Sequence, residues 1–414
     1  MNSLSSKGMT MASELRVGER IRYWRRRNGN RSQAAVAGLC GITEDYLSQI
    51  ERGRRTPTLE VLVALARELG VPTATLLDDQ LPPEQPARCL PSDVTRVLMG
   101  CTPPSASAPE PPESLRERVE EAWRTWQTSQ QRYTDTSSLL PGLLSDVEHA
   151  VRTCRSGTDA RARRETLRVA ADLYGLLRSY CRRIGRVDLS LLVADRALRA
   201  AEDADDPLRI AAAQWNLGHV LLAQDDPDGA EHIAALAAEK LAGAPSNSET
   251  DALTGALELV RSTAEARRRD WWAARDRIEN HAGPKARRVG EGNVHWTVFG
   301  PTNVLLHALS IEMLAGEASE GLRRANRIDI TQAPSVERQF TFLLDVARCY
   351  DLRREDAAVL VHLLDLEQIA PEDLARSTLA RQMVGDLRRR ARPTYRRQVE
   401  DLADRLGIDR RPVS

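Results

Sequence analysis

Arginines are concentrated near the start of this 414-residue chain. Between Arg16 and Arg55 the sequence has ten arginines and four acidic residues, a local net charge of +6 in a chain whose formal charge is zero. Guanidinium groups at this density can neutralise a row of phosphates, which is the part of nucleic-acid binding that does not depend on base sequence. One such arginine alone would be an ordinary solvated charge, but ten together indicate a phosphate-binding face.

Helix signals in the same segment show how these side chains would be positioned. Ser32 and Thr43 are expected N-caps, because a side-chain oxygen there accepts hydrogen bonds from the free N–H groups of the first helical turn. Gly53 is expected to end the helix that Thr43 begins. The segment predicts five short helices, near 14–28, near 32–39, near 43–52, from after Thr58 to Gly70, and from Pro72 to Asp78.

Three blocks of this segment resemble the Xre family, the phage-repressor type of helix-turn-helix. They are Ser32-Gln33-Ala34-Ala35-Val36-Ala37, Cys40-Gly41-Ile42-Thr43 and Tyr46-Leu47-Ser48-Gln49-Ile50-Glu51-Arg52-Gly53. The resemblance implies a DNA-binding domain at residues 14–79, whose third helix enters the major groove. It also implies an ion pair between Arg25 and Glu51, which makes Glu51 a structural residue.

Carried over residue by residue, the resemblance implies DNA contacts from the second helix, the third helix and the loop that follows. The contacts are Ser32, Gln33, Thr43, Glu44, Asp45, Ser48, Gln49, Arg52, Arg54 and Arg55. Gln49 can bond adenine in bidentate fashion, whereas Glu44 or Asp45 can accept from cytosine N4. The sequence departs from the family in its longer 28–31 connection and in having two acids at the head of the reading helix.

Composition changes sharply on either side of this domain. Residues 1–13 are polar and are expected to form a flexible tail. Between residues 80 and 112 there are nine prolines, which fix φ and remove N–H donors, so this stretch predicts an extended linker. A short helical piece is expected within it, at Ser92–Met99.

A pattern of small residues recurs through residues 113–414. The spacing in Gly185-x-x-Asp188-x-Ser190-x-x-x-Ala194-x-x-Ala197 returns at 225–237, and more weakly near Trp272, Ser319 and Asp356. Each copy would begin the second helix of a hairpin, where small residues let two helices cross closely. This predicts an α-solenoid and resembles degenerate tetratricopeptide repeats, with Asn216-Leu217-Gly218 and Ala230 as the best match. An unrelated helical bundle is the alternative. The expected fold is therefore all-α.

The arrangement of a helix-turn-helix joined to such repeats, together with the stretches Phe299–Val304 and Leu139–Leu144, resembles a group of actinobacterial regulators. In architecture alone it also resembles the peptide-sensing (RRNPP-type) regulators. The resemblance implies an effector on the side lined by the first helices. The candidate residues are Arg182, Trp215, Asn216, His219, Trp296, Asn303 and His307. Asparagine amides can pair with a peptide backbone, and Trp215 with Trp296 could form an apolar wall. A core role is the simpler explanation for any single one of them.

Several classes of function are excluded or disfavoured. The six cysteines lie far apart without metal-ligand spacing, and no H-E-x-x-H, G-x-S-x-G or Walker A motif is present, so we expect no catalytic residue, cofactor or metal. The first sixteen residues lack an apolar core, and the uncharged stretch Asn293–Ile311 contains a Gly-Pro and four Asn or His side chains. We expect a cytoplasmic protein without a membrane partner.

These observations predict a sequence-specific transcriptional regulator that binds a double-stranded DNA operator and a peptide or small-molecule effector. A homodimer is expected, because one such domain covers only a short half-site. The alternative is a regulator whose repeats bind a protein partner with no small ligand. A third possibility is a scaffold or enzyme with vestigial DNA binding. A closed pocket lined by Asn303 and Trp215 would favour the effector, whereas an open groove with an exposed apolar patch would favour the protein partner.

Overall fold

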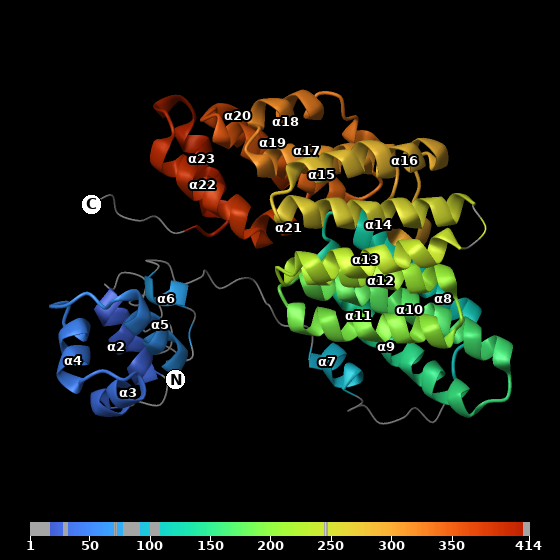
Figure 1. The fold of residues 1–414 in the computed structure, drawn as a ribbon, viewed down its shortest axis with the longest axis horizontal. Coiled ribbons are helices and arrows are strands. Elements are labelled where there is room, and N and C mark those ends of the chain that lie inside the picture. The colour runs from blue at the N-terminus through green and yellow to red at the C-terminus, as the bar shows by residue number, and fades with distance from the viewer. Residues whose placement is uncertain are drawn as a thin grey trace. The chain divides into compact units, whose positions relative to one another are not determined.

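The chain folds into two compact units, residues 1–86 and 87–414 (Figure 1). The computed structural model describes residues 17–27, 32–69, 71, 73–77, 92–99, 108–243, 245 and 247–408, and every regular element in that part of the chain is a helix. The predicted all-α fold is confirmed. The predicted tail at 1–13 and most of the predicted linker lie outside the described residues.

The first unit is built from short helices around a small apolar core. The helices are α2 (Val17–Arg27), α3 (Gln33–Leu39), α4 (Glu44–Glu51), α5 (Leu59–Glu68) and α6 (Thr73–Leu77). The predicted caps are confirmed, since the Ser32 hydroxyl accepts from the N–H of Ala35 and the Thr43 hydroxyl accepts from the N–H of Tyr46. The core includes Ile21, Val36, Leu47, Ile50, Leu62, Leu65 and Leu76.

The second unit is a series of helical hairpins stacked one on the next (Figure 1). Its helices are α7 (Ser92–Leu98), α8 (Pro112–Thr128), α9 (Arg132–Ser156), α10 (Ala160–Arg183), α11 (Val187–Asp203), α12 (Pro207–Ala223), α13 (Pro227–Ala242), α14 (Ser248–Arg267), α15 (Trp271–Asp276), the π-helix η1 (Arg277–Ala282), α16 (Gly283–Val289), the 3-10 turn η2 (Val294–Trp296), α17 (Pro301–Ala315), α18 (Ala318–Ala325), the 3-10 turn η3 (Ile330–Gln332), α19 (Val336–Leu352), α20 (Asp356–Ile369), α21 (Pro371–Arg376), α22 (Thr378–Arg390) and α23 (Pro393–Arg405).

The recurring small residues lie where the sequence predicts them. All five copies of the pattern begin the second helix of a hairpin, in α11, α13, α15, α18 and α20. In the two strongest copies, Ala194, Ala197, Ala230, Ala234 and Ala237 are almost completely buried. Without side chains beyond Cβ, they allow the second helix to lie close against the first.

The first helices of the hairpins form a closed circuit. In the described chain α8, α10, α12, α14, α17 and α19 contact one another in that order, and α19 returns to contact α8. We call this arrangement the inner circuit. The second helices α9, α11, α13, α18 and α20 each pack on the first helix of their own hairpin. Side chains on the inward faces of six helices are thereby brought together from across the sequence.

A buried ion pair connects an early helix of the second unit, α9, to a late one, α21, near the place where α19 returns to α8. The guanidinium of Arg132, at the start of α9, is fully buried, and its Nε lies 2.8 Å from Oδ2 of Asp373 at the start of α21. The backbone N–H of Tyr133 donates to Glu372 at 2.7 Å, and the Tyr133 hydroxyl donates to Asp373 at 3.1 Å. Arg132 also stacks over the ring of Trp126, 4.3 Å from its centroid. We call these contacts the latch.

One described stretch is long and apolar enough to cross a membrane, Val294–Ala315. In the folded unit 67% of that window is buried, and α17, its helical part, packs between α14, α18 and α19. This is the environment of a core helix.

Candidate functional site

The predicted reading helix presents polar side chains to solvent. Thr43, Glu44 and Asp45 are exposed at the N-terminal end of α4, and Ser48 and Gln49 are half-buried one turn later. The Gln49 amide donates to Oδ2 of Asp45 at 2.6 Å. An adenine contact by Gln49 would therefore require its amide to break the hydrogen bond to Asp45. Asp45 thus affects how readily Gln49 can bind a base.

The buried carboxylate of Glu51 joins α4, which carries this face, to α2 and α3. Arg25 donates from Nε and Nη2 to the two oxygens of Glu51, at 2.7 and 2.9 Å. The predicted ion pair is confirmed, and the hydrogen bond to Glu51 raises the pKa of Arg25 against the opposing effect of burial. Gln33 donates to the same carboxylate at 2.7 Å. In the free protein its side chain is thus tied to α4, at the base of the reading helix.

The loop after α4 carries three exposed arginines, Arg52, Arg54 and Arg55. The N–H groups of Arg54 and Arg55 both donate to the carbonyl of Gln49, at 2.9 and 3.3 Å. Arg52 folds back along the helix and donates from Nη2 to the Ser48 hydroxyl at 2.8 Å. The loop backbone is thereby fixed while the Arg54 and Arg55 guanidiniums extend into solvent, an arrangement suited to phosphate.

In the second unit, basic side chains meet inside the inner circuit. Arg178 and Arg182 come from α10, and Arg338 comes from α19. Arg178 is 2% exposed, donates to Oδ1 of Asn216, and lies 5.7 Å from the centroid of the Trp215 ring. Nη2 of Arg182 is 3.5 Å from a carboxylate oxygen of Glu337. These three arginines, with His219, His307 and Asn303, form what we call the interior cluster.

Both histidines of the interior cluster are neutral near pH 7. Burial is the main cause of their lowered pKa values, and the charges of Arg182, Arg178 and Arg338 lower the pKa of His219 further. Burial and Arg338 lower the pKa of His307 to about 3. Burial likewise lowers the pKa of Arg182 and that of Arg338 to about 10, and the charge of Arg182 adds to the effect on Arg338. The helices that carry these groups belong to the inner circuit, and an ion pair between Arg183 and Glu337 joins α10 to α19 beside them.

Asn303 is 3% exposed, and its side-chain amide makes no hydrogen bond within the described residues. His307, one turn later on α17, has only a 3.4 Å contact between its Nδ1 and the Thr263 hydroxyl. His219 packs edge-on against Trp215, with ring centroids 4.6 Å apart. The interior cluster thus contains polar groups whose hydrogen-bonding capacity the folded chain leaves unused.

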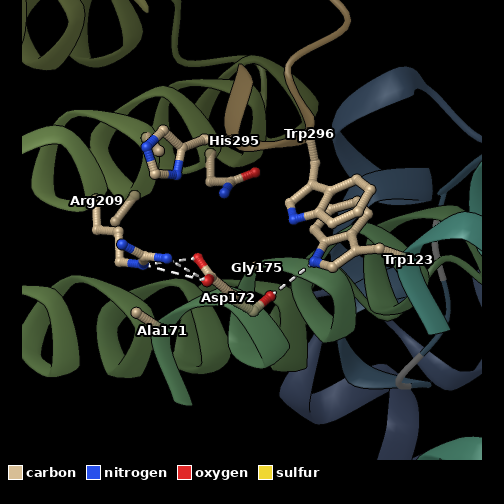
Figure 2. Close-up of a pocket in the computed structure, with 10 residues that line it drawn as sticks. Trp123, Ala171, Asp172, Gly175, Arg209, His295 and Trp296 are labelled. Atoms are coloured by element: carbon tan, nitrogen blue, oxygen red, sulfur yellow. Dashed lines mark hydrogen bonds and ion pairs between the residues drawn. The ribbon is translucent and has the colours of Figure 1, made fainter. Parts of the chain in front are cut away.

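A pocket adjoins the interior cluster at Asn216 (Figure 2). Its empty volume is about 280 Å³. Figure 2 shows the ring of Trp296 lying over that of Trp123, with centroids 5.3 Å apart and planes 4° apart. Asp172 lies opposite and is paired with Arg209 at 2.8 Å. Trp296 and Trp215 therefore have different ring partners, Trp123 for the first and His219 for the second.

Trp296 reaches α8 on a loop, residues 290–300, that we call the crossing loop. The carbonyl of Trp296 accepts from the Gln127 amide at 3.2 Å, and Asn293 donates to the same glutamine at 2.6 Å. His295, Trp296 and Val298 all have positive φ, between 46° and 64°. Such angles strain residues other than glycine, most of all a β-branched one. The bonds to α8 and the burial of Phe299 must offset this strain.

Comparison with known proteins places the first unit. A helix-turn-helix family model matches residues 21–76. Control protein C.BamHI of Bacillus amyloliquefaciens is 36% identical over 70 residues, which are 17% of this chain and 86% of that protein. The chain belongs to the helix-turn-helix family. An uncharacterised HTH-type transcriptional regulator of Sinorhizobium fredii, y4dJ, is 44% identical over 55 residues, 13% of this chain and 70% of that protein. The HTH-type transcriptional regulator DdrOP3 of Deinococcus deserti is 34% identical over 85 residues, 20% of this chain and 65% of that protein.

One of the solved structures similar to this chain covers most of its length. The crystal structure of Bacillus thuringiensis PlcR in complex with the peptide PapR7 and DNA covers 86% of this chain and 98% of that chain, at 12% sequence identity and a TM-score of 0.26.

The described residues hold no group of three or more His, Cys, Asp or Glu side chains that could bind a metal ion. Sequence reasoning singled out Arg182, His219, Asn303 and His307, and the structure places them on α10, α12 and α17 of the inner circuit, with Asn303 one turn before His307. It missed Arg178 and Arg338. The available signal was that Arg178 lies one turn before Arg182, on the same helical face, within the apolar run of α10.

Proposed function

We propose that this helix-turn-helix protein is a sequence-specific transcriptional regulator. Its second unit binds a peptide or small-molecule effector, and the protein acts as a homodimer in the cytoplasm. Two observations support the proposal: one unit has a helix-turn-helix with exposed polar and arginine side chains, and the other has an interior cluster of unsatisfied polar groups. A purely structural core would be expected to satisfy such groups internally.

The DNA half of the proposal assigns base reading to α4 and phosphate binding to the loop after it. Gln49→Ala should reduce discrimination between a selected operator and random DNA by about 1–3 kcal/mol, because a bidentate base contact is lost. Arg54→Ala should weaken binding to both DNAs alike and lower the slope of log affinity against log salt by about 1. Binding would be measured by fluorescence anisotropy on an operator selected from a random pool. Equal losses on both DNAs for Gln49→Ala would remove that residue from base reading.

The effector half of the proposal rests on Asn303, His219 and His307, whose side chains face the inner circuit with few or no partners. The first step is to release bound molecules from the purified protein and identify them by mass spectrometry. Each one is then added back while operator affinity is measured. Coupling of about 1–3 kcal/mol is ordinary for such a switch and must be reciprocal. Asn303→Ala should abolish the response and leave effector-free DNA binding intact. A normal response in that variant would place the effector elsewhere.

The dimer is proposed because paired half-sites, separated by about one helical turn of DNA, are the usual route to useful affinity for a domain of this size. Sedimentation equilibrium of the full chain at micromolar concentration tests it. A monomer that stays monomeric with operator present contradicts the proposal. An effector could alter the separation of the two reading helices by changing how the hairpins stack, because separate repeats contact only their neighbours.

A further inference from the structure

The arginines of the interior cluster, of which Arg178 is buried and Arg182 and Arg338 are partly exposed, differ from the other inward-facing arginines of the second unit in having almost no acid beside them. Arg132 is paired with Asp373, Arg209 with Asp172, and Arg277 with Glu265 at 2.8 Å or closer. In each case a carboxylate offsets the cost of removing a guanidinium from water. These three arginines are each paired with a carboxylate of the chain. An inward-facing arginine without such a partner therefore suggests that a negative charge from outside the chain binds it.

Arg338 is the clearest exception. Among the residues that the structure describes, its side chain has no hydrogen-bond or ion-pair partner, although its neighbour Glu337 bonds Arg183 and lies within 3.5 Å of Arg182. In the described chain Arg178 has one hydrogen-bond acceptor, the neutral amide oxygen of Asn216, and its buried Nε has none. Three guanidiniums thus share one region with one carboxylate at its edge, and none of the three has a full set of acceptors.

The remaining members of the cluster are suited to the same kind of ligand. Asn303 offers an amide without a partner, and both imidazoles can donate an N–H. Arginine forks bind carboxylate and phosphate oxygens in bidentate fashion, and such charge-assisted bonds are among the strongest in proteins. Arg178 is 2% exposed and lies 5.7 Å from the centroid of the Trp215 ring, so water weakens an electrostatic contact made there less than one at the surface.

We propose that Arg178, Arg182 and Arg338 form a binding site for an oxyanion, a carboxylate or a phosphate group, that the effector carries. The proposal rests on the proposed effector function, because it assigns a chemical class to the ligand of the same site. Carboxylate and phosphate share the chemistry that these guanidiniums recognise, and they imply different effectors. A peptide would present its terminal carboxylate, whereas a phosphorylated small molecule would present its phosphate.

The test uses two simple probes, inorganic phosphate and N-acetylglycine, with the full-length protein carrying labelled histidines. Each probe is titrated at constant ionic strength while the imidazole resonances are followed by NMR. We expect saturable shifts for His219 and His307 with at least one probe, and no shift for the exposed His281. The probe that binds more tightly identifies the source, phosphate for a phosphorylated molecule and N-acetylglycine for a peptide terminus. Absence of a saturable shift with both probes overturns the proposal.

Arg338→Met supplies the second arm. It should weaken binding of the preferred probe about tenfold or more, because a charge-assisted fork is lost. It should also raise the melting temperature of the probe-free protein, because it removes a like charge that has no partner. A merely structural arginine would give a lower melting temperature and unchanged binding, and that result overturns the proposal. Arg338→Lys, which keeps the charge and loses the fork, should bind with intermediate affinity. The matched control is Arg199→Met on α11, where the side chain is 73% exposed.

Failure of the oxyanion site and failure of the effector function can be told apart. The NMR titration measures binding at the interior cluster and needs no DNA. If phosphate or N-acetylglycine binds there but no released molecule alters operator affinity, the effector function fails and the anion site stands. If a released molecule alters operator affinity in wild type and in Arg338→Met equally, the effector function stands and the anion site is wrong.

Discussion

A single methyl group added at Gly255 should disturb the packing of the crossing loop against α14. Gly255 lies in α14, and a Cβ atom built there would overlap Cζ and Cε1 of Phe299. Phe299 is 1% exposed, so its ring has no free space into which it can move. Gly255→Ala therefore either strains the packed core or expels the ring, and the crossing loop with it.

The size of the effect follows from two opposing contributions. Alanine in a helix interior is favoured over glycine by about 1 kcal/mol. Loss of a buried phenylalanine ring costs about 3–5 kcal/mol. If the ring is expelled, Gly255→Ala should lower the free energy of unfolding by about 2–4 kcal/mol. If the ring stays, overpacking of about 1–3 kcal/mol replaces that cost, and the net loss is smaller.

Urea unfolding followed by tryptophan fluorescence measures this effect, because six of the seven tryptophans belong to the second unit. Gly385→Ala in α22 is the matched control, since a Cβ there meets no atom within 4 Å, and it should stabilise by up to about 1 kcal/mol. In a Phe299→Ala background, Gly255→Ala should become neutral or stabilising. A stable Gly255→Ala single variant, or an equal cost in both backgrounds, would refute the seating of Phe299 against this glycine.

Three other predictions concern buried ionisable side chains. Arg25→Met should destabilise the first unit by about 3–5 kcal/mol, because the 2%-exposed Glu51 is left without its counter-charge; hydrogen exchange of the α4 amides in the full chain measures it, and a loss below 1 kcal/mol would contradict it. His219 and His307 have folded pKa values below their unfolded value of 6.5, so between that pH and their folded pKa values these two side chains take up protons only in the unfolded chain. The free energy of unfolding should therefore fall on acidification, by up to about 4 kcal/mol at pH 5 for the pair. This dependence on pH should vanish when both residues are Gln. Asp373→Asn should lower the free energy of unfolding in urea by about 3–5 kcal/mol, because its fully buried partner Arg132 keeps its charge. An unchanged midpoint would show that the latch does not stabilise the second unit.

Features governed by neighbours in the sequence could be predicted well. The caps Ser32 and Thr43 need only a hydroxyl placed three residues before an N–H, and both bonds form as expected. The small-residue pattern in Ala230, Ala234 and Ala237 marks one helix face, so it predicted where each hairpin turns back. The Arg25 and Glu51 pair was found through a family resemblance that fixes how two helices cross.

Features made by distant parts of the chain could not be predicted in this way. The partners in the latch, Arg132 and Asp373, are 241 residues apart, and no local pattern connects them. Arg178 and Arg338 are two among many arginines in the sequence, and their isolation from acids depends on how six helices close on one another. The possible apolar wall of Trp215 and Trp296 rested on residue type alone, which could not show that the crossing loop carries Trp296 to Trp123 of α8.

Closure of the inner circuit changes how this unit should fold and unfold. A linear array of repeats can fray from either end, since each terminal repeat has only one neighbour. Here the contacts of α8 with α19 and of α9 with α21 give the terminal hairpins a second neighbour. Amide hydrogens near the ends of the array should therefore exchange as slowly as those in α12 or α14, as part of one cooperative unit. Folding, in turn, cannot finish until segments more than two hundred residues apart have met, and this high contact order makes closure a slow, late step.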